Sequence, residues 1–197
     1  MILLRYDDKM GGKIDSYTDA VPLNAVFRAY HLPGFLDDKI YIADIIANIA
    51  GGGRSSKLFT DLVENKQIAS SIGAYVDRRE ETSLLIFYAI ANNEKISVDQ
   101  LDNELISNIM SFKEDLVSDY EMNKTINQLT TQAAYEIQFS SGLADIASSQ
   151  VLFWNDPSRI YKLLDFYKKI SENDLISFSN EFLNEGKSVR IDVLAAS

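Results

Sequence analysis

Few side chains in this sequence could build a catalytic or metal centre. The 197 residues include one histidine, His31, and no cysteine. A metal site on His31 would need carboxylate partners such as Asp37 or Asp38, and a single imidazole is more often a hydrogen-bonded polar residue near a strand end. A nucleophilic Ser55 would need a nearby base, and no Gly-x-Ser-x-Gly elbow is present. We therefore predict no catalytic residue and no metal ligand in this chain.

The run Gly51-Gly52-Gly53-Arg54-Ser55-Ser56 offers a different chemistry, because it precedes a predicted helix. Its amides, guanidinium and hydroxyls could hold an anion or a substrate carboxylate, which makes Gly53, Arg54 and Ser55 possible contacts. The run is not a P-loop, since the spacing and the Gly-Lys-Ser/Thr ending are absent. We favour a structural interpretation, a tight junction between two helices with Ser55 or Ser56 as N-cap.

Composition excludes several classes of protein. The 19 Lys and Arg against 29 Asp and Glu give a formal charge of -10, which argues against nucleic-acid and anionic-membrane partners. The lack of cysteine fits a reducing or an oxidising compartment, so a cytoplasmic and a periplasmic location both stay open. No stretch approaches a membrane span, so we expect a soluble chain. The abrupt start, too polar for a signal peptide, suggests a fragment of a longer protein.

Hydrophobic periodicity indicates the elements that position these residues. In residues 25–31, Val26, Arg28 and Tyr30 share one face, as in a strand with one buried side that ends before Pro33-Gly34. Isoleucines then recur at helical spacing after a cap at Asp37 or Asp38, up to Gly51. The following elements are predicted to be a helix over 55–66, a strand over 68–76, a solvated charged turn over 77–81 and a strand over 83–91.

The strand over 83–91 is almost continuously apolar, which predicts a central strand covered on both faces. Capping boxes at Ser97-x-x-Gln100, Ser118-x-x-Glu121 and Ser171-x-x-Asp174 mark helix starts. Five helices are expected, near 98–115, 119–139, 142–154, 157–170 and 172–185, and Gly186 is expected to end the last. The aromatic series Phe153, Trp154, Tyr161, Phe166 and Tyr167 is assigned to helix packing rather than to a ligand cage.

The resulting order of elements is strand, two helices, hairpin, helices and strand. It predicts an α+β fold in which helices cover one face of a largely antiparallel sheet, and Val189, Ile191 and Val193 form a last strand that returns to it. Residues 1–24 are expected to be an irregular N-terminal segment with at most one short strand. Residues 25–197 are then a single α+β lobe.

Several blocks of sequence follow one another in a recognisable order. They are Ala29-Tyr30-His31-Leu32-Pro33-Gly34, the stretch 50–59 around the glycine run, Leu62-Val63-Glu64-Asn65-Lys66-Gln67-Ile68-Ala69, Gly73-Ala74-Tyr75, Ser118-Asp119-Tyr120-Glu121, Trp154-Asn155-Asp156-Pro157-Ser158-Arg159 and Ile170-Ser171-Glu172-Asn173-Asp174-Leu175. Together they resemble the pitrilysin or insulinase family of zinc metallopeptidases, which includes mitochondrial processing peptidase and bacterial zinc proteases. The resemblance covers about residues 22–197.

This resemblance implies a lobe of a metallopeptidase half-unit. Family members close two homologous halves around an unfolded peptide, each half holds two α+β lobes, and one half carries His-x-x-Glu-His, with two zinc ligands and a general base. The segment that would hold this motif is missing here, so no cofactor is expected in this chain and zinc is expected in the parent protein. The Arg and Tyr that the other half uses on substrate would fall on Val63 and Ser70, which cannot replace them. Since the region Phe153-Trp154-Asn155-Asp156-Pro157-Ser158-Arg159 resembles the zinc-bearing half, we favour the second lobe of that half over a half that has lost the pair.

Two functions remain open from sequence. The first is a non-catalytic, chamber-forming lobe of a zinc-dependent endopeptidase, inactive as this isolated chain, with the remaining lobes or a homologous subunit as partner. The second is a catalytically silent binding or assembly module of the same family. In the first case a peptide substrate could add to an exposed strand edge. The candidate edge is residues 68–76, with Ser70, Ile72 and Ala74 as possible contacts.

Overall fold

A computed structural model describes residues 11–114 and 117–196 of the chain. Within these residues one five-stranded sheet has the spatial order β1-β5-β2-β4-β3. The strands are β1 (Lys13–Asp19), β2 (Ala25–Pro33), β3 (Ala69–Asp77), β4 (Thr82–Ala91) and β5 (Ser188–Ala195). β1 runs parallel to β5, and the other three pairs are antiparallel. The predicted α+β class with a largely antiparallel sheet is therefore confirmed.

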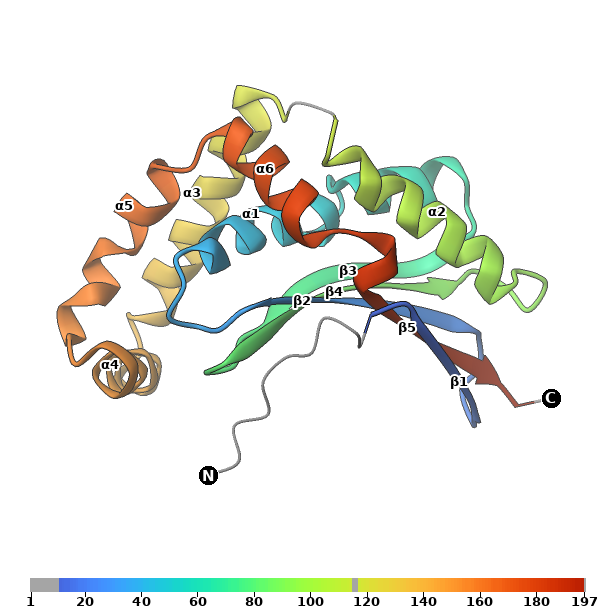
Figure 1. The fold of residues 1–197 in the computed structure, drawn as a ribbon, viewed down its shortest axis with the longest axis horizontal. Helices are drawn as coiled ribbons and strands as arrows, with labels where there is room; N and C mark the ends of the chain where they lie inside the picture. The colour runs from blue at the N-terminus through green and yellow to red at the C-terminus, as the bar shows by residue number, and fades with distance from the viewer. Residues whose placement is uncertain (1–10, 115–116, 197) are drawn as a thin grey trace.

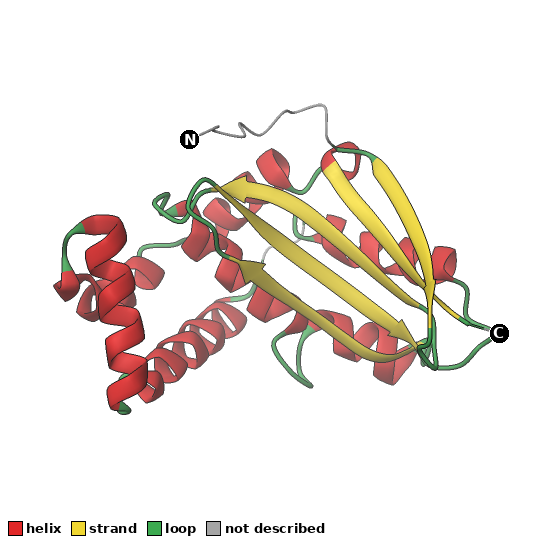
Figure 2. Cartoon of the chain, turned by 90° about the horizontal axis from the view of Figure 1, so that it is seen from below, coloured by secondary structure: helices red, strands yellow, loops and turns green. Residues whose placement is uncertain are grey.

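The helices lie together on one side of this sheet (Figure 1). They are α1 (Lys39–Gly51), α2 (Val98–Ser111), α3 (Asp119–Glu136), α4 (Ser140–Trp154), α5 (Leu163–Lys168) and α6 (Glu172–Phe182), with the π-helix η2 (Phe59–Asn65) and the 3-10 helices η3 (Pro157–Lys162) and η4 (Glu185–Lys187). Figure 2 shows the opposite face, which no described helix crosses. The chain therefore has one covered and one open sheet face.

The prediction that β4 is covered on both faces needs correction, because its two faces are not equally covered. It is a central strand as predicted, but its residues alternate between fully buried and half-buried. On the open face the Phe27 and Tyr88 rings stack at 5.6 Å between centroids. A Cβ on Gly73 would lie 2.4 Å from the Tyr88 ring, so glycine is needed under it. The long apolar run in β4 thus serves the core on one side and an apolar, partly exposed surface on the other.

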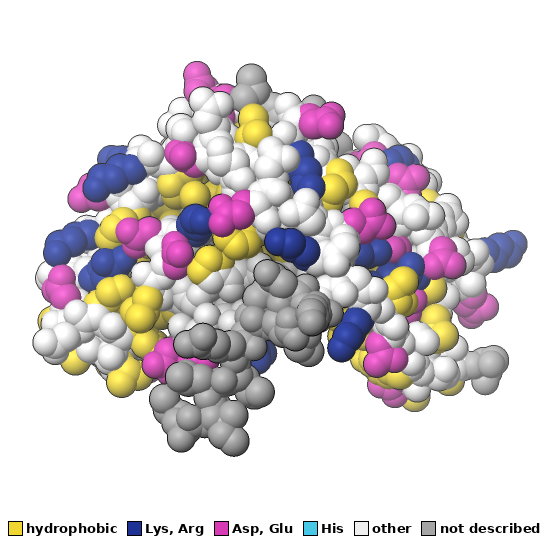
Figure 3. All heavy atoms as spheres, viewed as in Figure 1, with side chains coloured by type: hydrophobic (Ala, Val, Ile, Leu, Met, Phe, Trp, Pro, Cys, Tyr) yellow, Lys and Arg dark blue, Asp and Glu magenta, His cyan; other side chains and the backbone are white. Residues whose placement is uncertain are grey.

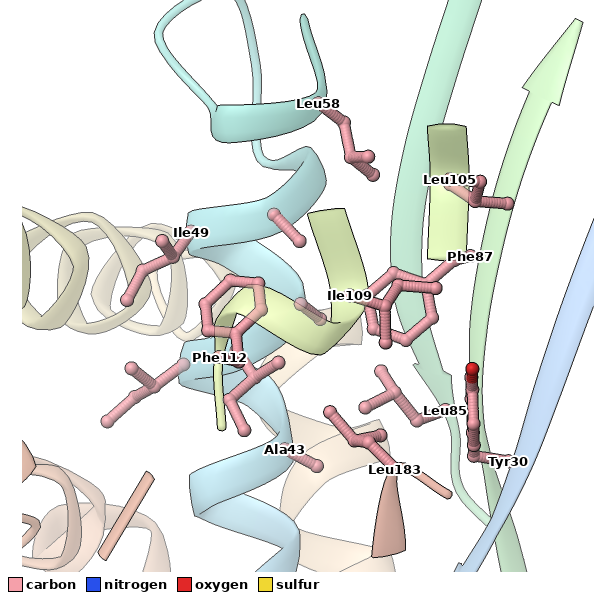
Figure 4. Close-up of a cluster of buried hydrophobic side chains, with 14 of the residues drawn as sticks. Tyr30, Ala43, Ile49, Leu58, Leu85, Phe87, Leu105, Ile109, Phe112 and Leu183 are labelled. Atoms are coloured by element: carbon pink, nitrogen blue, oxygen red, sulfur yellow. The ribbon is translucent and has the colours of Figure 1, made fainter. Parts of the chain in front are cut away.

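The core lies between the covered sheet face and the helices (Figure 4). Leu85 and Phe87 of β4 meet Leu105 and Ile109 of α2, and all four side chains are almost completely buried. Alternation along β4 and helical spacing along α2 bring these residues to one interface. The core therefore forms from sequence patterns that each element carries locally.

A cluster of buried charges stands beside this apolar core, where β2, β5 and α2 meet. The Arg28 guanidinium donates from Nε and Nη2 to the two carboxylate oxygens of Asp102, both at 2.6 Å. Arg190 donates to Asp102 at 3.0 Å and to Asp192 at 2.7 and 2.8 Å. Each of these four residues is at most 6% exposed. Since buried charges are tolerated only when they are paired, this network fixes β5 against β2 and α2.

Several predicted boundaries need correction. Helix starts were predicted well, since Ser118 and Ser171 form complete capping boxes. Ser97 accepts a bond from the Gln100 amide, and no complete box is described there. Four helices end earlier than predicted: α2 at Ser111, α3 at Glu136, α5 at Lys168 and α6 at Phe182. α5 also follows a 3-10 turn, and α6 ends before Gly186. The helix predicted over 55–66 is mainly a π-helix, in which the Lys66 amide donates to the Asp61 carbonyl.

Residues 1–24 were predicted to be irregular with at most one short strand, and the described part of this segment contains the edge strand β1. Lys13 pairs with Val189 and Asp19 with Ala195, so β1 follows β5 along its whole length. All seven residues of β1 are exposed. β1 therefore extends the sheet without adding to its core.

Candidate peptide-binding edge

β3 is the edge strand opposite β1. Within the part of the chain that the structure describes, it stands at the end of the sheet and pairs on one side only, with β4. The pairing contains a register shift between Ala69 and Ser71, as at a β-bulge. Because an edge strand offers one row of backbone donors and acceptors to another extended chain, β3 is a physical candidate for binding a peptide.

A hollow of about 420 Å³ runs beside this strand. β3 contributes Ala74, Tyr75 and Val76 to it, α1 contributes Asp44 and Asn48, and α3 contributes Gln132 and Glu136 among others. At its end α1 lies very close to the strand, since a Cβ on Gly51 would be 2.3 Å from the Ala74 nitrogen. The first glycine of the run therefore lets helix and edge strand meet.

Three side chains distant in sequence join at the end of this hollow. The Arg78 guanidinium forms an ion pair with Asp44, and the Tyr167 hydroxyl donates to the same Asp44 oxygen at 2.9 Å. Burial raises the pKa of the Asp44 carboxyl, and burial also raises that of the Tyr167 hydroxyl. Arg78 was predicted to lie in a solvated turn; it is instead tied to α1 while 38% of its side chain stays exposed.

Asp44 was not predicted as a site residue, because it lies on the side of α1 opposite the face formed by Ile42, Ile45, Ile46 and Ile49, where a carboxylate gives no special signal. Asp44 is separated by 34 residues from Arg78 and by 123 from Tyr167. Such a triad depends on tertiary packing and leaves no local pattern. It holds the end of β3 against α1 and α5.

The predicted residues Gly53, Arg54 and Ser55 form a junction between α1 and η2, as the structural interpretation expected. Gly53 has φ +117°, a conformation that favours glycine. The Ser55 hydroxyl accepts a hydrogen bond from Lys124 of α3. The helical segment begins at Lys57 and the Thr60 amide donates to the Ser56 carbonyl, so Ser56 stands at the predicted N-cap position, but its hydroxyl forms no described capping bond. Gly53, Arg54 and Ser55 are not among the residues lining the hollow beside β3.

The predicted contacts on β3 occupy three different environments. The Ser70 hydroxyl donates to the Ala91 carbonyl at 2.8 Å, next to the bulge. Ile72 packs against the core from the covered face of the sheet. Val63 of η2 also packs against the core. Ala74 lines the hollow. Of the six residues proposed from sequence, Ala74 is the one placed beside both the free edge and a cavity.

His31 lies on the open face of the sheet, in register with Leu84. Burial lowers the pKa of its imidazole. Across the described ranges 11–114 and 117–196, no three His, Cys, Asp or Glu side chains are arranged to hold a metal ion. No zinc chemistry is therefore assigned to these residues. No helix in these ranges is both long and apolar enough to cross a membrane.

Comparison with known proteins identifies the family. The sequence model of the peptidase M16 inactive domain matches residues 4–129. This chain belongs to the peptidase M16 inactive-domain family. The curated relatives of this inactive domain include the zinc protease PqqE of Helicobacter pylori, 23% identical over 178 residues that make up 89% of this chain and 39% of PqqE. The chain thus spans about two fifths of that relative.

Solved structures share the fold of this inactive domain. A protease from Helicobacter pylori superposes with a TM-score of 0.86 at 21% identity, over 95% of this chain and 45% of that protein. An inactive peptidase domain from Bordetella parapertussis superposes with a TM-score of 0.79 at 17% identity, over 92% of this chain and 95% of that domain. The predicted resemblance to the pitrilysin type of metallopeptidase is confirmed, and this chain is a non-catalytic domain of that family.

Proposed function

We propose that this inactive domain lines the substrate chamber of a zinc-dependent endopeptidase, in which another lobe holds zinc and cleaves the peptide. Family membership supports this role, together with relatives named as zinc proteases that are more than twice as long as the chain. The sequence has one histidine and no cysteine of its own to offer a metal. The domain therefore acts by shape and binding, and the metal-bearing lobe supplies the hydrolysis.

The single observation that carries a substrate role is the unpaired edge of β3 beside an open hollow. An extended peptide that adds to this edge gains backbone hydrogen bonds, which make few demands on its side chains. Binding through the peptide backbone suits a chamber that receives unfolded chains of varied sequence.

The open sheet face supplies the surface for packing against the rest of the parent peptidase or a homologous subunit. Besides Phe27 and Tyr88 it carries Tyr75 and Ile191, which are 46% and 38% exposed. These residues share a face because Tyr75 pairs with Ile86 and Ile191 pairs with Phe27 in adjacent strands. A contiguous apolar surface of this kind is typical of a protein interface.

The absence of hydrolysis can be measured directly on the purified chain. With added zinc and a quenched fluorogenic peptide we expect no chelator-sensitive cleavage. Appreciable cleavage that a chelator abolishes would refute the non-catalytic role.

Binding at the β3 edge is tested with N-methylated peptides. Methylation of alternate amides on one side of an extended peptide removes the donors that face β3, while methylation on its other side is the matched control. We expect the first series to lose binding at least tenfold more than the second, measured by fluorescence anisotropy. Equal losses would exclude strand addition.

The second candidate, a catalytically silent assembly module, is favoured by the same open sheet face. In that role the face binds a partner subunit and the β3 edge binds no peptide. Stable association with a metallopeptidase subunit, together with no peptide binding in the anisotropy experiment, would favour this function over the first.

A further inference from the structure

A second hollow continues the first one past the end of β3. It has a volume of about 360 Å³ and lies between the β3–β4 turn and α4. Arg78 lines both hollows, so the two adjoin at this residue. A chain extended along β3 advances about 3.3 Å per residue and reaches the second hollow within a few residues of Val76.

The two hollows differ in chemistry. The first offers the strand edge and polar side chains such as Asn48 and Gln132. The second has three apolar walls, from Phe35 in the loop after β2 and from Ile146 and Phe153 in α4. Its charged residues belong mainly to the turn, where Arg79 is already held by Asp77 at 2.6 Å.

Two of the apolar walls, Phe35 and Phe153, pack against each other. The Phe35 ring packs against Phe153 and Trp154, with centroids 5.1 and 4.6 Å apart. The Arg78 guanidinium lies 5.8 Å from the Phe35 ring centre and is held by its ion pair with Asp44. A preformed apolar recess binds a side chain with little ordering cost.

We propose that a peptide added to the β3 edge places a bulky apolar side chain in this second hollow, against Phe35, Ile146 and Phe153. This rests on the proposed function, because the β3 edge must first bind the peptide backbone. The occupant is an extended polypeptide, since an unpaired strand leads directly to the recess. The domain then selects unfolded segments by one apolar residue near one end of the bound stretch.

The experiment uses a labelled ten-residue peptide of alternating Thr and Val that carries Phe, Leu or Ser at one scanned position. Binding to the purified chain is followed by fluorescence anisotropy. At the position that reaches the recess we expect Phe or Leu to bind about tenfold more tightly than Ser. At the other positions the three peptides should bind alike.

Two variants of α4 make the test specific. Ile146→Ser removes an apolar wall of the recess, whereas Leu152→Ser changes an exposed side chain that does not line it. We expect Ile146→Ser to abolish the preference for Phe over Ser and Leu152→Ser to keep it. Circular dichroism confirms that both variants are folded, and the wild-type comparison of Phe with Ser stands without any variant.

The outcomes separate this inference from the proposed function. If peptides bind and N-methylation on one side weakens them, but Phe, Leu and Ser bind equally at every position, the recess proposal is wrong and strand addition survives. If no peptide binds at all, strand addition fails and the recess proposal fails with it. A preference that persists in Ile146→Ser also overturns the assignment of the recess.

Discussion

Asp102 shows how much of this domain depends on single buried charges. Its carboxylate accepts two bonds from Arg28 and one from Arg190, and it joins α2 to β2 and β5. Arg28 and Arg190 pair directly in the β2–β5 register. Without an acid between them, two guanidinium groups would repel each other in a site with little access to water.

Replacing Asp102 with Ala should lower the free energy of unfolding by about 3–5 kcal/mol, because the buried Arg28 loses its paired carboxylate and Arg190 loses one of its three carboxylate partners. The matched control is Asp99→Ala. Asp99 also binds Arg190, but its side chain is 79% exposed, so its loss should cost about 1 kcal/mol or less. Urea unfolding of both variants measures the difference, and similar losses would contradict a central role for Asp102.

His31 gives a second residue-scale prediction, because it is the sole histidine of the sequence. Burial lowers the pKa of its imidazole below the unfolded value of about 6.5. As pH falls below that value, the unfolded state binds a proton that the folded state does not, so the free energy of unfolding decreases until the folded pKa is reached.

The His31→Gln variant isolates this effect. We expect the wild type to lose more stability than the variant when urea unfolding is compared at pH 7 and pH 5.5. The carboxylates titrate in both proteins, so the difference reports His31. Parallel pH profiles would show that the folded and unfolded imidazoles share one pKa.

At the scale of elements, local sequence determined where helices begin but not where they end. Ser118 and Ser171 lie three residues from the acids that complete their boxes, so the signal is contained in four residues. α6 stops at Phe182 because the chain must turn into β5, and Leu183 becomes completely buried there. That stop depends on the sheet, which a local pattern does not describe.

The candidate site, too, was predicted from sequence only in part. Alternation predicted a strand over 68–76, which agrees with β3, but its position at the edge depends on how β5 and β1 join the other side of the sheet. The Asp44, Arg78 and Tyr167 group comes from three elements and could not be found from spacing. Edge and cavity are therefore properties of the assembled sheet.

The capping box of α3 can be tested alone. Ser118→Ala removes the side-chain acceptor for the Glu121 amide and should cost about 1 kcal/mol of unfolding free energy. Ser148→Ala, within α4, removes a hydroxyl that bonds only a carbonyl of its own helix and should cost nothing measurable. Denaturant unfolding of the two variants measures the difference. An unchanged free energy of unfolding in Ser118→Ala would exclude the capping box as a source of stability.

At the scale of the molecule, α4 differs from the other described α-helices because its side chains are the least buried. None of its residues is buried, and Asp145 is its only charge. Leu143, Val151 and Leu152 are 38%, 46% and 77% exposed. Hydrophobic side chains are accordingly visible at the end of the molecule where α4 lies (Figure 3). A helix surface with a single charge and exposed apolar side chains favours association.

Leu152→Glu should reduce self-association of the purified chain and change its unfolding free energy by no more than about 0.5 kcal/mol. Phe153→Glu is the contrasting variant, since Phe153 packs on Phe35 and its replacement should loosen α4. Sedimentation velocity across a concentration series measures association. An unchanged distribution for Leu152→Glu would mean that this surface does not associate.

β5 lies between β1 and β2, yet it is formed by residues 188–195, near the end of the chain. During synthesis on the ribosome, β2 can pair with β4 long before β5 has left the exit tunnel. Until then the other side of β2 stays open, Arg28 lacks the neighbouring strand, and β1 has nothing to pair with. Completion of the sheet therefore waits for β5, and until that strand is available the growing chain carries an open edge on β2 that a chaperone could shield.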